Sequence, residues 1–66
     1  MDILARMEKD GISQVEMIKT LKQRNKIIVQ PAEMSQILNG ILTTPKATRV
    51  VRAVMEVLDE VENGAD

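Results

Sequence analysis

The apolar positions of the chain recur at helical spacing in four segments, and residues that end helices separate these segments. The first segment, Asp2–Asp10, places Ile3, Leu4 and Met7 about one helical turn apart. Gly11 follows it, and glycine is the residue that most often ends a helix in a left-handed backbone conformation. The pattern therefore predicts a short first helix.

A helix start is marked clearly at Ser13. Ser13 and Glu16 have the spacing of a capping box, in which each side chain bonds the backbone N–H of the other residue. Ile12 before the cap and Met17 after it have the spacing of a hydrophobic staple. These signals predict a second helix over residues 13–24.

The next segment, Ile27-Ile28-Val29, is apolar and β-branched, which would suit a strand. It has no second run of this kind to pair with, so we expect an extended connection whose side chains enter the core. Pro31 suits the first position of a helix, and Gly40 suits the position after its end. A third, short helix is expected over residues 31–39.

The last segment has the longest apolar stripe. Thr44 suits an N-cap and Pro45 the first helical position, which predicts a fourth helix over residues 45–62. Its apolar residues are spaced four, three, four and three apart, with two valines widening the stripe: Ala47, Val51, Val54, Leu58 and Val61, with Val50 and Val57. The chain is thus expected to form a single domain over residues 1–66, all-α, as a compact bundle of four to five helices.

Composition excludes several classes of protein. The 66 residues include no Cys, His, Phe, Tyr or Trp, so disulfides are excluded, a structural zinc site is very improbable, and base stacking on aromatic rings has no side chain to use. No catalytic constellation, metal site or cofactor site is predicted, and we expect no enzyme. No apolar run is long enough to span a membrane and no signal-peptide pattern is present, so a cytoplasmic location is expected.

The net charge of −1 counts against nucleic-acid binding until its distribution is considered. Residues 19–52 carry seven basic side chains and one acidic one. Residues 53–66 carry five acidic side chains and no basic one, and residues 1–18 are also acidic on balance. The middle of the chain is therefore the part that suits phosphate contacts, although these charges would also simply solvate their helices.

Three motifs, in this order along the chain, resemble the lambda-repressor/Cro-like (XRE-type) helix-turn-helix family, and in particular its small phage-type regulators. They are Ser13-Gln14-x-Glu16, Ser35-Gln36-Ile37-Leu38-Asn39-Gly40 and Thr43-Thr44-Pro45-Lys46-Ala47. The resemblance implies a transcriptional regulator, a repressor or Cro-like protein, whose recognition helix lies in the major groove of double-stranded DNA. The chain departs from the family at Ile18, where a small residue is usual, at Pro31, and in a connection within Lys22–Gln30 that is longer than the family turn.

The resemblance also implies roles for individual residues. Base edges would be read from the third helix, by Ala32, Glu33, Ser35 and Gln36. Phosphates would be contacted by Gln14 and Asn39. Lys22, Lys46 and Arg49 are further candidates for phosphate contacts, because cations there would add affinity with little sequence choice.

Two alternatives stay open at this point. Regulators of this family usually bind DNA as dimers, and the fourth helix has an apolar stripe that would suit a homodimer interface or simply the core of one chain: Val50, Val54, Val57, Leu58 and Val61. The helix-turn-helix would also serve as a protein-interaction module, such as an antirepressor or inhibitor that binds another regulatory protein. Asn63–Asp66 would be the start of a linker if the chain were one domain of a longer regulator.

Overall fold

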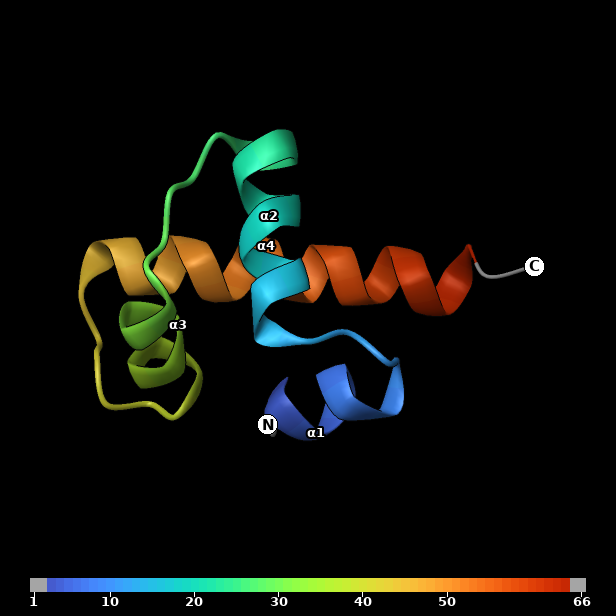
Figure 1. Ribbon diagram of the computed structural model, residues 1–66, viewed down its shortest axis with the longest axis horizontal. Helices are drawn as coiled ribbons and strands as arrows, with labels where there is room; N and C mark the ends of the chain where they lie inside the picture. The colour runs from blue at the N-terminus through green and yellow to red at the C-terminus, as the bar shows by residue number, and fades with distance from the viewer. Residues whose placement is uncertain (1–2, 65–66) are drawn as a thin grey trace.

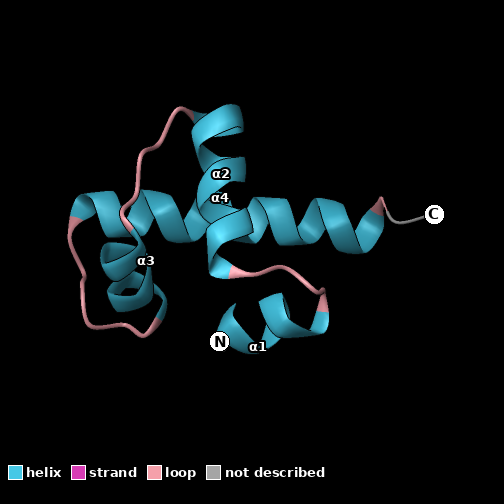
Figure 2. Cartoon of the chain, in the orientation of Figure 1, coloured by secondary structure: helices cyan, strands magenta, loops and turns pink. Residues whose placement is uncertain are grey.

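The computed structural model of the protein describes residues 3–64, and these form four helices (Figures 1 and 2). They are α1 (Ile3–Lys9), α2 (Gln14–Asn25), α3 (Pro31–Leu38) and α4 (Pro45–Asn63). The described residues contain no strand, so the all-α prediction is confirmed and the number of helices is four. The expected helix start at Asp2 and the last two residues of the possible linker, 65–66, lie outside the described residues.

The long helix α4 is the element on which the other three pack. In Figure 1 it runs along the whole molecule, α2 crosses it, and α3 lies near its N-terminal end. Each of the other helices contacts α4, and α2 also contacts α3. Six residues of α4 are buried, and together with seven from the rest of the chain they form one apolar core: Ile3, Met7, Met17, Leu21, Val29, Met34, Ile37, Ala47, Val50, Ala53, Val54, Val57 and Leu58.

The helix starts follow the predicted capping chemistry. The Glu16 N–H donates to Ser13 Oγ at 3.1 Å, and the Ser13 N–H donates to Glu16 Oε1 at 3.3 Å, which completes the capping box. Thr44 Oγ1 accepts from the Ala47 N–H at 3.1 Å at the start of α4. Pro31 and Pro45 lie at the first helical position of α3 and α4, where a missing N–H costs no hydrogen bond.

The connection between α2 and α3 is one residue shorter than the predicted helix bounds imply. Helix α2 continues to Asn25, and the connection is the five residues Lys26–Gln30. Lys26 has a left-handed backbone (φ 58°), and its N–H and that of Ile27 both donate to the Leu21 carbonyl, which ends α2 in a tight turn. Val29 then enters the core and Ile27 packs against it, as predicted, but Ile28 is 63% exposed, so the prediction is wrong for Ile28.

Burial of the valine and leucine stripe of α4 within one chain favours its interpretation as core over its interpretation as a homodimer interface. Val50, Val54 and Leu58 are fully buried within the single chain, and Val57 is 5% exposed. Val61 alone among the five is exposed, at 38%. The other three helices already cover this face, so four of the five residues have no surface left for a second chain.

The acidic C-terminal end of α4 is balanced by arginines from two other helices. The Arg6 guanidinium on α1 donates to Asp59 Oδ1 at 2.9 Å and to both carboxylate oxygens of Glu62, and Arg24 of α2 pairs with Glu60. The hydrogen bonds from Arg6 lower the pKa of Glu62. Negative charge at a helix C-terminus is unfavourable by itself, and these arginines offset it while linking α1 and α2 to α4.

Burial of Leu58 predicts a strong dependence of stability on this side chain. Leu58→Ala should lower the free energy of unfolding by about 2–5 kcal/mol, through lost apolar burial and the cavity left behind. Val61→Ala, the exposed control three residues on, should change it by about 0.5 kcal/mol or less. Urea unfolding followed by circular dichroism measures both, and an unchanged stability for Leu58→Ala would contradict the core described above.

The environment of the Asp10 carboxyl predicts how the stability of the fold depends on pH. Its Oδ2 atom is buried without a hydrogen-bond partner, and desolvation, together with the nearby Glu62 carboxylate, raises its pKa above the ordinary 3.8. A carboxyl whose pKa is higher in the folded state than in the unfolded state destabilises the fold as pH rises through these values. Asp10→Asn should therefore raise the Tm at pH 7, and the difference from the unmodified chain should shrink towards pH 3.

Thermal unfolding at the two pH values tests this expectation. Glu8→Gln, an exposed carboxylate on α1, is the matched control and should show no such pH-dependent gain. An equal gain at both pH values for Asp10→Asn would show that the Asp10 carboxylate carries no desolvation penalty.

Candidate nucleic-acid interface

Helix α3 has one polar side that the rest of the chain leaves uncovered. Ser35, Gln36 and Asn39 follow Ala32 by three, four and seven residues, so the four share one side of the helix and its C-terminal cap. Ala32, Gln36 and Asn39 are exposed, and Ser35 is half-buried. We refer to these four residues as the outward stripe.

The opposite side of α3 is held by the core. Met34 is fully buried and Ile37 is 3% exposed, and both belong to the apolar cluster that contains Met17 and Leu21 of α2. Helix α3 has only eight residues, too few to be stable in isolation. Packing against α2 and α4 therefore fixes the direction of the outward stripe.

Glu33, predicted to read bases, lies beside the outward stripe and not within it. Its carboxylate pairs with Lys46 at the start of α4, with Lys46 Nζ 3.1 Å from Glu33 Oε1. Both side chains are partly exposed, at 31% for Glu33 and 41% for Lys46. The structure thus brings together a residue predicted to read bases and one predicted to contact phosphate, in a contact that tethers α3 to α4.

Asn39 and Gln14 lie at two helix ends. The Asn39 amide donates to the Ser35 carbonyl at 2.7 Å and lies 3.4 Å from Ser35 Oγ, so the side chain folds back on α3. Gln14 is the first residue of α2 and is half-buried. Its backbone N–H belongs to the N-terminal turn of α2, where free N–H groups favour an anion.

Lys22 and Arg49 are exposed on two different helices. Lys22 shares a side of α2 with Val15 and Lys19, at the spacing of successive helical turns. Arg49 lies on α4, one turn after Lys46. Within residues 3–64 neither Lys22 nor Arg49 has an ion-pair partner, so both cations are available to a ligand.

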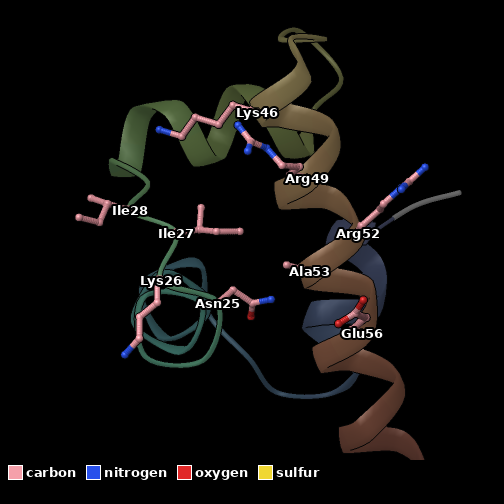
Figure 3. Close-up of a pocket in the computed structure, with 9 residues that line it drawn as sticks. All are labelled: Asn25, Lys26, Ile27, Ile28, Lys46, Arg49, Arg52, Ala53 and Glu56. Atoms are coloured by element: carbon pink, nitrogen blue, oxygen red, sulfur yellow. The ribbon is translucent and has the colours of Figure 1, made fainter.

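A groove of about 570 Å³ lies between the end of α2, the α2–α3 connection and the first half of α4 (Figure 3). We call it the basic groove because four cationic side chains line it: Lys26, Lys46, Arg49 and Arg52. Lys46 and Arg49 were predicted from the sequence as site residues, whereas Lys26 and Arg52 were not. The missed signal was the spacing of Lys46, Arg49 and Arg52, three residues apart on one helix.

The chain matches no protein-family model, no curated protein and no solved structure. None of the helices between residues 3 and 64 combines the length and the apolar character needed to cross a membrane. The function is therefore inferred from the side chains of the outward stripe and the basic groove.

Proposed function

We propose that this chain is a transcriptional regulator that binds double-stranded DNA sequence-specifically, with α2 and α3 as the helix-turn-helix and α3 in the major groove. One observation carries the proposal. The outward stripe of α3 is open to solvent, while the apolar side of the same helix is fixed against α2 and α4. A recognition helix needs this combination, because base edges must be reached by side chains held in a constant direction.

The side chains on the outward stripe suit base edges. The Gln36 amide can pair with N6 and N7 of adenine, the Ser35 hydroxyl can serve several bases, and the Ala32 methyl can contact the methyl group of thymine. An α-helix with its side chains is about 10–12 Å in diameter, which fits the width of the major groove, about 12 Å. Asn39 would contact a phosphate once its amide leaves the Ser35 carbonyl.

The arrangement of charges supports the same orientation. Lys46 lies next to α3, and Gln14 begins the helix that packs behind it. Many of the acidic side chains lie near the C-terminal end of α4, far from α3 in Figure 1, and Arg6 and Arg24 pair with three of them. Although the protein has a net negative charge, the surface that it would present to the duplex is thus less acidic than its C-terminal end.

Binding to duplex DNA is the first test. Fluorescence anisotropy at low salt, with random duplexes and with fragments selected from a genomic library, should give an affinity that falls steeply with salt. Selected fragments should bind at least about a thousandfold more tightly than random ones, which is the usual specificity of such domains. If selection enriches no sequence and all duplexes bind alike, the proposal of a sequence-specific regulator is wrong.

Gln36 and Lys22 should respond in different ways to substitution. Gln36→Ala should cost about 1–3 kcal/mol on the best duplex and relax the preference at one base pair, because a bidentate amide contact is lost. Lys22→Ala should weaken binding to all duplexes alike, because it removes a phosphate contact. It should also reduce the slope of log affinity against log salt concentration by about one. Selection repeated with each variant measures both effects, and a Gln36→Ala protein with unchanged preference would exclude Gln36 from base reading.

The Glu33–Lys46 pair predicts a gain in affinity. Glu33→Gln removes the negative charge beside the outward stripe and frees Lys46, so it should strengthen binding to every duplex by about three- to tenfold at low salt. Its cost to stability should stay below about 1 kcal/mol, as for other exposed pairs. Glu8→Gln on α1 has the same charge change and should leave DNA affinity nearly unaltered. Weaker binding to all duplexes by Glu33→Gln would mean that Glu33 itself contacts the DNA.

A further inference from the structure

The basic groove combines positive charge with exposed apolar surface. Its four cations come from two separate parts of the chain, Lys26 from the end of α2 and the others from successive turns of α4 (Figure 3). Only Lys46 has an ion-pair partner among the described residues. The other three place unneutralised positive charge around one concave surface, which favours an anionic ligand.

Apolar side chains lie between these cations. Ile27 and Ile28 of the α2–α3 connection and Ala53 of α4 line the same groove. Ile28 is 63% exposed, so most of its apolar side chain is open to a ligand in the groove. Ala53 belongs to the core and is only 4% exposed, so Ile28 is the exposed apolar residue of the groove. A ligand that fits the groove therefore carries apolar groups as well as negative charge.

We infer that the basic groove binds an acidic peptide segment of a partner protein, with carboxylates on the cations and an aliphatic side chain over Ile28. The inference concerns a surface apart from the outward stripe of α3 and does not require DNA binding. Charge complementarity selects an anionic partner, because Arg49 and Arg52 can form bidentate pairs with Asp and Glu carboxylates. The volume of the groove suits a few side chains of such a segment.

A phosphate backbone fits the groove less well. Glu56 closes the end of the groove away from Lys46, ten residues or about 15 Å along α4. A strand with a charge on every nucleotide would meet the Glu56 carboxylate, whereas a peptide can place an uncharged residue there. The sugar-phosphate chain also offers only small sugar carbons flanked by oxygens, and no aliphatic side chain, to cover Ile28.

The groove has two cations in common with the proposed DNA surface. Lys46 and Arg49 line the groove and are also candidates for phosphate contacts. A bound acidic peptide would neutralise them and lower the affinity for any duplex. Under the proposed function, the partner would thus act as a competitor of DNA.

Fluorescence anisotropy with a labelled synthetic peptide tests the inference. The probe is a peptide of about twelve residues, mostly Glu, with two Leu four positions apart. Its controls have every Glu replaced by Gln or both Leu replaced by Ser. The first peptide should bind with a Kd on the order of tens of micromolar at about 50 mM salt, and each control should bind at least about tenfold more weakly.

Three variants locate the site on the chain. Arg52→Ala and Ile28→Ser should each weaken peptide binding by about five- to tenfold. The first removes a positive charge that pairs with a carboxylate, and the second removes apolar surface that a leucine covers. Lys9→Ala, an exposed cation on α1 outside the groove, should leave it unchanged. Because Arg52 and Ile28 are not among the proposed DNA contacts, duplex binding measured on the same variants separates failure of this inference from failure of the proposed function.

Backbone amide shifts from NMR identify what occupies the groove. Peptide addition should shift the signals of Ile28 and Ala53 and leave those of α1 in place. The inference is wrong if no peptide binds more tightly than millimolar, or if Arg52→Ala and Ile28→Ser bind the peptide as well as Lys9→Ala does. It is also wrong if duplex DNA, and not the peptide, shifts Ile28 and Ala53, because the groove would then belong to the DNA surface.

Discussion

The structure depends on the burial of one side of α4. A chain without aromatic residues must build its core from aliphatic and methionine side chains, and α4 supplies almost half of the buried set. Helices α1, α2 and α3 are each short, and their contacts with α4 are what hold them in place. The direction of every candidate functional side chain follows from this packing.

Local signals in the sequence were sufficient for the helices. The Ser13 capping box, the two prolines at first helical positions and the glycines after α1 and α3 each have a short-range physical cause, and the structure contains all of them. The length of the α2–α3 connection was less predictable. It depends on Lys26 adopting a left-handed backbone, which lysine seldom does.

The candidate site shows where sequence patterns stop being informative. An apolar stripe has the same spacing whether it faces its own chain or a second one, so Val50, Val54, Val57 and Leu58 suited both interpretations until their burial was known. The pairing of Glu33 with Lys46 and the basic groove join residues far apart in the sequence. Such contacts arise from tertiary packing, which periodicity does not encode.

The separation of charge along α4 has a consequence for how the molecule meets a large anion. Lysine and arginine line the first half of the helix, and the second half ends in carboxylates that Arg6 and Arg24 neutralise in part. The molecule therefore has an electric dipole roughly along its longest dimension. An approaching polyanion would exert a torque on that dipole before any contact forms, so encounters would occur mainly with α3 leading and the C-terminal end trailing.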